Sequence, residues 1–221
     1  MKKAIYVIIA GGGRVGSHLA KILEPSGKDI VVIEKDQQVC EKLSSDINAL
    51  VICGDASDKK TLEEAKIQMA DVFVAVTGND NENIVACQLA KYSYKVPLVL
   101  ARVEDVTRAQ MLHGMGIDLI VSPSHVASMV LENAIALPGT TSILVSETIT
   151  RAVEVSVPDV SKIAGKKIKD LSLPAECVFA AMYRGGKLII PRGDTVVKAG
   201  DIVALIGKED AIRKAVNLLK G

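Results

Sequence analysis

The chain has 221 residues, a net charge of +1 and 49% hydrophobic residues. This length allows one large or two small domains, and the hydrophobic content excludes general disorder. The near-neutral charge excludes a strongly basic nucleic-acid binder, and aromatic residues at only 3% argue against stacking of single-stranded bases. We therefore expect a globular protein without a nucleic-acid partner.

The first 138 residues alternate between two patterns. Short apolar runs predict strands over 4–10, 29–34, 49–53, 71–76, 98–102 and 119–121. Stretches with helical spacing predict helices over 15–24, 38–45, 59–67, 83–94, 106–114 and 125–137. Six strands alternating with helices predict an α/β fold, a Rossmann-like doubly wound parallel sheet.

The pattern changes after Pro138 and Gly139, which close the helix over 125–137. Strands are predicted over 143–145, 152–157, 178–183, 187–190 and 202–206, with a hairpin turn at 184–186 and a last helix over 208–219. This pattern predicts a small α+β C-terminal domain. The expected division is a nucleotide-binding domain over residues 1–138, including the helix 125–137 as a crossover, and a second domain over 139–221.

The sharpest motif follows the first strand. Residues 11–16 read Gly-Gly-Gly-Arg-Val-Gly and fit the pattern G-x-G-x-x-G at the start of a predicted helix. The first glycine permits a tight turn, the second a close approach to a pyrophosphate, and the third packing of helix on strand. We interpret Gly11, Gly12, Gly13, Arg14 and Val15 as a phosphate-binding loop, with Arg14 placed to meet an anion.

An acidic residue occupies the position at which dinucleotide-binding folds carry a carboxylate for the ribose. Glu34 ends the second strand, 18 positions after Gly16, where a carboxylate can accept hydrogen bonds from a ribose. A 2′-phosphate would meet like charge there, so Glu34 favours NAD(H) or an adenine nucleotide over NADP(H).

Further polar residues follow the third, fourth and fifth strands, whose carboxyl ends share one edge of the sheet. Asp55 and Ala56, Thr77 and Gly78, and Arg102 are therefore candidate nucleotide contacts. Alternatives stay open for three of these strand-end residues. Asp55 and Asp80 could instead cap helices. Arg102 could reach a partner subunit, or pair on the surface with Glu104 or Asp105.

Catalytic and metal-binding patterns are missing from the sequence. His18, His113 and His125 form no constellation with other polar groups, so we expect no catalytic residue. The four cysteines include no C-x-x-C pair, which favours reduced thiols over a disulfide framework or a zinc site. The N-terminal apolar run is too short for a signal peptide, so we expect a cytoplasmic protein.

The chain resembles the regulator-of-potassium-conductance (RCK) proteins, the peripheral subunits of Trk/Ktr-type potassium transport. The resemblance covers nearly the whole chain and rests on matching segments in both parts: 11–16, 31–34, 54–56, Asp80 with Asn83, 90–91, 101–103, 165–166, 171–174, 191–195 and 199–201. Some relatives carry a glutamate after the proline that follows the sixth strand. Here Ser124 follows Pro123, so no metal site is expected.

The resemblance implies a cytoplasmic regulatory subunit of a potassium transporter or channel, at the inner face of the membrane. It also implies that the glycine loop, Arg14, Glu34 and the other strand-end residues bind NAD(H) or an adenine nucleotide (AMP, ADP or ATP). It further implies dimers and rings, for which the apolar face of the helix over 125–137 is suited. The alternatives are an NAD-dependent oxidoreductase and a transcriptional redox sensor, although no basic helix-turn-helix is evident.

Overall fold

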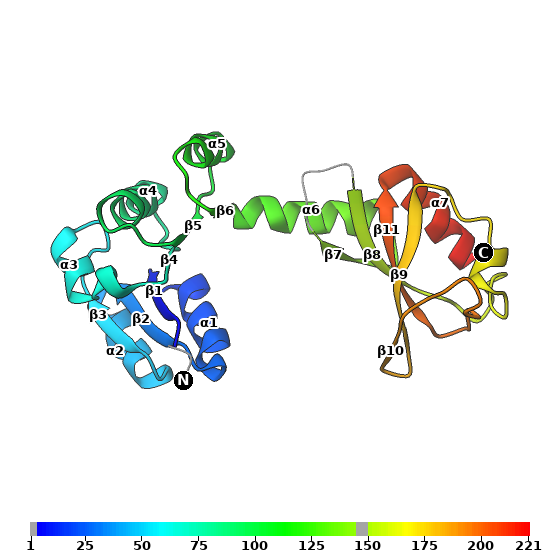
Figure 1. Cartoon of the computed structure of the whole chain (residues 1–221), viewed down its shortest axis with the longest axis horizontal. Coiled ribbons are helices and arrows are strands. Elements are labelled where there is room, and N and C mark those ends of the chain that lie inside the picture. Colours follow the sequence, from blue (N-terminus) through cyan, green and yellow to red (C-terminus); the bar gives the residue numbers. More distant parts are fainter. Residues whose placement is uncertain (1–3, 145–149) are drawn as a thin grey trace. The chain divides into compact units, whose positions relative to one another are not determined.

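The computed structural model describes residues 4–144 and 150–221. Its internal contacts divide the chain into two units, Met1–His125 and Val126–Gly221, each with its own sheet (Figure 1). The boundary predicted between residues 138 and 139 stays a prediction.

The first unit is built on a six-stranded, fully parallel sheet. Its strands are β1 (Tyr6–Ala10), β2 (Asp29–Glu34), β3 (Leu50–Cys53), β4 (Val72–Ala75), β5 (Leu98–Arg102) and β6 (Leu119–Val121), in the order β3-β2-β1-β4-β5-β6. This order confirms the Rossmann-like prediction. It reverses between β1 and β4, and doubly wound sheets bind ligands in the crevice beside such a reversal.

Helices connect the strands: α1 (Arg14–Leu23), α2 (Gln37–Asp46), α3 (Lys59–Glu64), α4 (Asp80–Gln88) and α5 (Val106–Gly114). Side chains of Asp36, Asp58, Asn79 and Asp105 accept backbone N–H groups at the starts of the last four. The helix predicted from residue 83 begins earlier, at Asp80, because Asn79 caps it. That helix continues as a π-helical turn over Leu89–Ser93.

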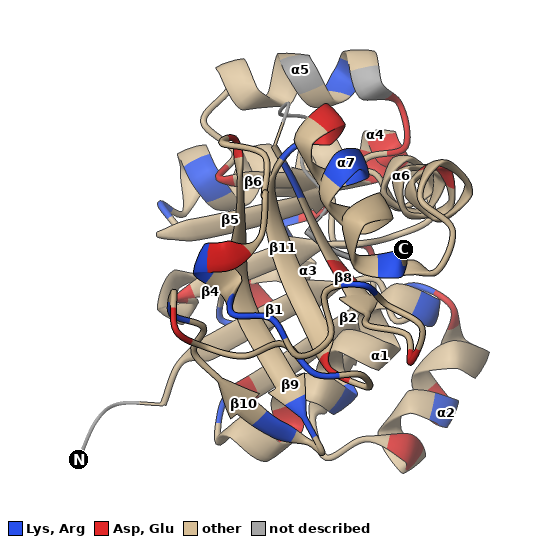
Figure 2. Cartoon of the chain, turned by 90° about the vertical axis from the view of Figure 1, so that its right-hand side faces the viewer, with Lys and Arg blue, Asp and Glu red and all other residues tan. Residues whose placement is uncertain are grey.

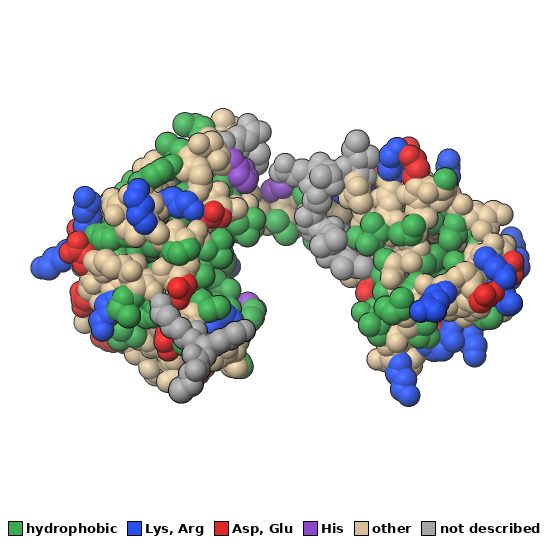
Figure 3. Space-filling model, in the orientation of Figure 1, with side chains coloured by type: hydrophobic (Ala, Val, Ile, Leu, Met, Phe, Trp, Pro, Cys, Tyr) green, Lys and Arg blue, Asp and Glu red, His purple; other side chains and the backbone are tan. Residues whose placement is uncertain are grey.

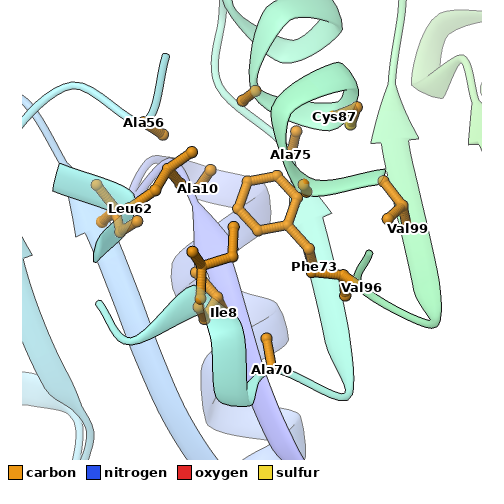
Figure 4. Close-up of a cluster of buried hydrophobic side chains, with 14 of the residues drawn as sticks. Ile8, Ala10, Ala56, Leu62, Ala70, Phe73, Ala75, Cys87, Val96 and Val99 are labelled. Carbon is orange, nitrogen blue, oxygen red and sulfur yellow. The ribbon is translucent and has the colours of Figure 1, made fainter. Parts of the chain in front are cut away.

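The sheet of the first unit is buried on both faces, as its continuous apolar strands require. In β1, Ile8 and Ala10 belong to one hydrophobic core, while Val7 and Ile9 belong to the other. Successive strand residues point to opposite faces, so one apolar strand contributes to two cores. Phe73 of β4 is fully buried in the first core (Figure 4).

The second unit contains an antiparallel sheet in the order β10-β9-β11-β8-β7. Its strands are β7 (Thr140–Leu144), β8 (Thr150–Ser156), β9 (Cys177–Arg184), β10 (Lys187–Ile189) and β11 (Ile202–Lys208), and its last helix is α7 (Glu209–Lys220). β7 begins three residues before the predicted strand over 143–145, whose last residue lies outside the described residues. The small α+β domain is thus confirmed.

Helix α7 is amphipathic. Ala211, Ile212, Ala215, Val216 and Leu219 are buried in the same core as Met182 of β9. The charged residues of the helix are Glu209, Asp210, Arg213, Lys214 and Lys220 (Figure 2). Charged and apolar side chains are interspersed over the visible surfaces of both units (Figure 3).

Helix α6 (Pro123–Ala136) crosses the boundary between the units. Val126, Val130, Leu131 and Ile135 are exposed on it in the single chain, and the last of these is 79% exposed. Neither α6 nor any other helix of the described chain has the length and apolar character needed to cross a membrane.

Two cysteines depart from the prediction of reduced thiols. Cys40 of α2 and Cys53 of β3 are joined as a disulfide, with Cα atoms 6.1 Å apart. The sequence spacing gave no sign of this pair, because packing of α2 beside the end of β3 brings the residues together. Cys87 and Cys177 are free and buried, and burial raises the pKa of the Cys87 thiol to about 12.

Candidate functional site

A cavity of about 540 Å³ opens where the strand order reverses, at the carboxyl ends of β1 to β5. This volume lies within the range of small-molecule sites. Of the residues considered as nucleotide contacts from the sequence, Gly12 and Asp80 do not line the cavity. The others do: Gly11, Gly13, Arg14, Val15, Glu34, Asp55, Ala56, Thr77, Gly78 and Arg102.

The glycine loop is shaped by close backbone contacts. Gly11 has a φ of +108°, and a Cβ there would lie 2.8 Å from the backbone nitrogen of Thr77. A Cβ on Gly16 would lie 1.8 Å from the carbonyl oxygen of Gly11, so only glycine lets α1 pack this close to β1. Around Gly13, by contrast, a Cβ would meet nothing within 4 Å, which leaves room for a ligand.

Helix α1 begins differently from the helices that follow it in this unit. Gly13 occupies the N-cap position, and within the described chain no side chain caps it. The first N–H groups of a helix lack partners inside the helix, and they favour anions such as phosphate. Gly13 and Arg14 both line the cavity, so the uncapped start of α1 borders it.

Glu34 is held by three backbone groups. Its Oε2 accepts the N–H of Gly12 at 2.7 Å, and its Oε1 accepts the N–H groups of Lys35 and Asp36 at 2.8 and 2.9 Å. A carboxylate offers about four lone-pair sites, so one is left for a ligand hydroxyl. These bonds also explain why Gly12 does not line the cavity: its N–H is taken by Glu34, and a Cβ there would lie 2.3 Å from Leu43 Cδ1.

Asp55 and Asp80, for which helix capping was the alternative role, do not cap helices. Asp55 accepts the N–H and hydroxyl of Ser57 at 2.7 and 2.6 Å, and these bonds lower its pKa below the ordinary value. Asp58, three residues later, caps α3. Asp80 is the first residue of α4, and its carboxylate accepts the N–H groups of Glu104 and Asp105.

Arg102 forms the surface ion pair considered for it, and its contact with a nucleotide stays a prediction. It lines the cavity, and its Nη2 lies 2.8 Å from Glu104 Oε1. The pKa of Glu104 is lowered by hydrogen bonding to Ser124 and by the Arg102 guanidinium. A ligand phosphate near Arg102 would therefore compete with Glu104 for this guanidinium.

Further residues line the cavity beside the predicted contacts: Ile33, Lys35, Gly54, Val76, Asn79, Glu82 and Pro123. Two of them form an ion pair, with Lys35 Nζ 2.5 Å from Glu82 Oε1, which raises the pKa of Lys35. Nothing in the sequence pairs these positions, because they are 47 residues apart and meet only through the sheet.

Asn83 is a structural residue of the site that was not among the candidate contacts named from the sequence. It is fully buried. Its Oδ1 accepts from the backbone N–H and the hydroxyl of Thr77, and its Nδ2 donates to the carbonyl oxygens of Thr77 and Arg102. Asn83 therefore fixes the ends of β4 and β5 relative to each other. Its presence beside Asp80 in the family pattern was the only available signal.

The described residues contain no group of three His, Cys, Asp or Glu arranged to hold a metal ion. His18 and His113 are exposed, and neither is among the residues that line the cavity.

The comparisons with known proteins agree with this geometry. The TrkA-N domain model matches residues 7–123, and the TrkA-C domain model matches residues 152–220. The chain belongs to the TrkA family. This confirms the resemblance to proteins of Trk-type potassium transport, since both domain models match and the similar curated proteins are Trk system potassium uptake proteins.

Two curated relatives align with nearly the whole of this chain. The Trk system potassium uptake protein TrkA homolog of Methanothermobacter thermautotrophicus is 38% identical over 218 residues, covering 98% of this chain and 100% of the relative. The homolog of Pyrococcus abyssi is 33% identical over 222 residues, covering 98% of each chain.

Solved structures share the TrkA fold. The GsuK channel has a TM-score of 0.71 at 18% identity, and the GsuK channel bound to NAD has 0.68 at 19%. Each similarity covers all of this chain but only 40% of the channel chain. A GsuK structure bound to ADP matches 59% of this chain and 34% of its own, at 25% identity and a TM-score of 0.52.

Proposed function

We propose that this chain is a nucleotide-sensing regulatory subunit of a potassium transporter or channel. In this role it binds NAD(H) or an adenine nucleotide in the cavity of the first unit and gates a membrane partner from the cytoplasmic side. The observation that carries the proposal is the convergence of the glycine loop, Glu34 and Arg102 on one cavity at the strand-order reversal. Relatives named for potassium uptake, and GsuK structures named for NAD and ADP, support it.

The cavity fits the two ends of such a ligand. The open space at Gly13, the uncapped start of α1 and the Arg14 side chain suit the phosphates. The remaining acceptor site on Glu34 suits a ribose hydroxyl, which can donate to it. Asp55, whose pKa is lowered by Ser57, adds negative charge on the side of the cavity where β3 ends.

Calorimetry with NADH, NADPH, AMP, ADP and ATP tests this proposal. We expect binding of NADH and adenine nucleotides in preference to NADPH, because a 2′-phosphate would meet the Glu34 carboxylate. Glu34→Ala should weaken binding by one or two hydrogen bonds, each worth about 0.5–1.5 kcal/mol. Glu64→Ala, an exposed glutamate outside the cavity, is the matched control. Tighter binding of NADPH than NADH to the wild type would contradict the proposed pocket chemistry.

The proposed role is non-enzymatic, and the alternative is an NAD-dependent oxidoreductase. Such an enzyme needs an acid or base beside the nicotinamide, usually His, Lys or Tyr. Of these types the described cavity lining contains only Lys35, which is paired with Glu82. Steady NADH oxidation with any of a panel of small carbonyl substrates would favour the enzyme over the regulator.

We also propose that the chain works as a homodimer or a ring. The support is the exposed apolar side chains of α6, which cannot all remain in water without cost. Light scattering at micromolar concentration should give at least a dimer. Replacing Leu131 and Ile135 together by Ser should shift the distribution towards monomer.

A further inference from the structure

The cysteine pair Cys40 and Cys53 lies beside the proposed nucleotide cavity. A second hollow of about 420 Å³ is lined by both cysteines together with Lys35, Gln37, Glu41, Ser44 and Gly54. Lys35 and Gly54 line the nucleotide cavity as well, so the two hollows share a wall. Cys53 is an exposed residue and Cys40 a buried one, so a reagent in solution meets Cys53 first.

The pair is connected to Glu34 through the backbone. Glu34 and Cys53 are directly paired on β2 and β3, and the Glu34 carbonyl oxygen accepts the N–H of Gly54 at 2.8 Å. The Cys40 sulfur lies 3.2 Å from the same carbonyl oxygen, within reach of a thiol donor when this cysteine is reduced. The Cys40–Cys53 link therefore ties α2, which follows Glu34 and Lys35 in the chain, to the end of β3, which Gly54 and Asp55 follow.

We propose that Cys40 and Cys53 form a reversible redox site that adjusts nucleotide affinity in the neighbouring cavity. Its coupling to affinity rests on the proposed nucleotide binding. The Cα separation of 6.1 Å lies within the range that a disulfide spans without backbone movement, so the oxidised and reduced forms share one fold. Oxidation fixes the spacing of two cavity walls, and a preorganised site binds more tightly.

The chemistry is thiol–disulfide exchange with a small-molecule disulfide. The Cys53 thiolate attacks one sulfur of the reagent, breaking its S–S bond and releasing one thiolate. The Cys40 thiolate then attacks the Cys53 sulfur of the mixed disulfide and releases the second. Two electrons pass from the cysteines to the reagent, and the two cysteine protons end on the two released thiols. A small-molecule dithiol reverses the sequence.

The remaining cysteines provide an internal contrast. Cys87 and Cys177 are buried, and burial raises the pKa of each thiol, so neither forms thiolate readily at neutral pH. Among the described cysteines, only the Cys40–Cys53 pair combines two nearby sulfurs with an exposed residue.

The first experiment equilibrates the full chain with mixtures of reduced and oxidised glutathione, then alkylates free thiols and counts them by mass spectrometry. We expect Cys40 and Cys53 to lose and regain alkylation together, while Cys87 and Cys177 react only after unfolding. A pair that stays oxidised in excess dithiothreitol, or never closes in oxidised glutathione, overturns the reversible site.

The second experiment measures ADP affinity by calorimetry in both states. We expect oxidation to tighten binding by about threefold or more, and Cys53→Ser to abolish this difference. Cys177→Ser, in the other unit, should preserve it. Equal affinities, or weaker binding after oxidation, overturn the coupling. If neither state binds any adenine nucleotide or NADH, the proposed function fails, while the thiol counts still decide the redox site.

Discussion

The carboxylate of Glu34 accepts the backbone N–H of Gly12 at 2.7 Å, so the end of β2 holds the glycine loop in place. Glu34 thus has a structural role that is separable from its proposed contact with ribose. We expect Glu34→Gln to lower the stability of the first unit without ligand, because an amide cannot accept on both sides. The loss should be roughly 1–3 kcal/mol. Urea unfolding measures it, and Glu64→Gln should change the midpoint little.

The contact between Gly16 and Gly11 predicts a larger loss. In Gly16→Ala the new Cβ would lie 1.8 Å from a carbonyl oxygen, and no side-chain rotation can relieve a contact with backbone. We expect a destabilisation of about 3 kcal/mol from overpacking. Gly114→Ala is the matched control, since a Cβ there meets nothing within 4 Å. A denaturation midpoint for Gly16→Ala equal to that of the control would contradict the packing of α1 on β1.

Removing the Asn83 side chain should loosen two strand ends at once. Asn83→Ala removes the acceptor of the Thr77 N–H group and the donor to the Arg102 carbonyl oxygen. Each buried polar group left unpaired should lower the free energy of unfolding by roughly 1–3 kcal/mol. Hydrogen exchange should become faster at the ends of β4 and β5, and nucleotide affinity should fall with it. Asn48→Ala, at an exposed bend, should leave both measurements unchanged. Unaltered exchange at Thr77 would show that the side chain is not the link.

The ion pair of Arg184 with Asp201 predicts an acid-sensitive second unit. Asp201 is fully buried and accepts from Arg184 Nε at 2.7 Å and Nη2 at 2.8 Å, and this bonding lowers its pKa. A carboxyl whose folded pKa is lowered stabilises the fold above its ordinary pKa. That stability is lost as the pH falls through the folded value.

We therefore expect Asp201→Asn to cost roughly 1.5–3 kcal/mol at neutral pH and to flatten the decline in stability below about pH 4. Amide exchange in β9 and β11, followed from neutral to acidic pH, measures this. Asp194→Asn removes an exposed ion pair with Lys169 and should have an effect under about 1 kcal/mol. Parallel pH profiles for wild type and Asp201→Asn would refute the assignment.

Arg14 is exposed at the cavity, where ligands with different phosphates differ most. We expect Arg14→Ala to keep adenosine-end binding but to lose discrimination among AMP, ADP, ATP and NADH. One charge-assisted hydrogen bond is worth roughly 1.5–3 kcal/mol, whereas a near-complete two-state shift takes about 5.5 kcal/mol, so several coupled sites are needed. Affinities for this panel, with small-angle scattering of each complex, test the idea. An unchanged ranking and shape response in the variant would remove Arg14 from the mechanism.

Much of the fold could be predicted because local pattern and global topology agree. The apolar runs of the six parallel strands are buried on both faces, which is why each reads as continuous rather than alternating. The helix boundaries were less predictable. The start of α4 depends on Asn79 acting as cap, and the run Asn79-Asp80-Asn81 offers more than one residue able to cap.

The sequence could predict those cavity-lining residues that lie at the end of a strand or directly after it. Glu34, Asp55, Thr77 and Arg102 are each at or just after a strand end, which the sequence reveals. Lys35 with Glu82, and Cys40 with Cys53, depend on which strands and helices become neighbours. No local pattern carries that information, so these pairs emerged only with the structure.

The bonds of Asn83 have a consequence for how ligand preference can change. Three of the four groups that it binds belong to the main chain: the N–H and carbonyl of Thr77 and the carbonyl of Arg102. Every amino acid except proline supplies the same groups. The side chains at positions 77 and 102 can therefore be exchanged while the strand ends that carry them keep their positions, which makes this wall of the cavity a place where specificity can evolve without refolding.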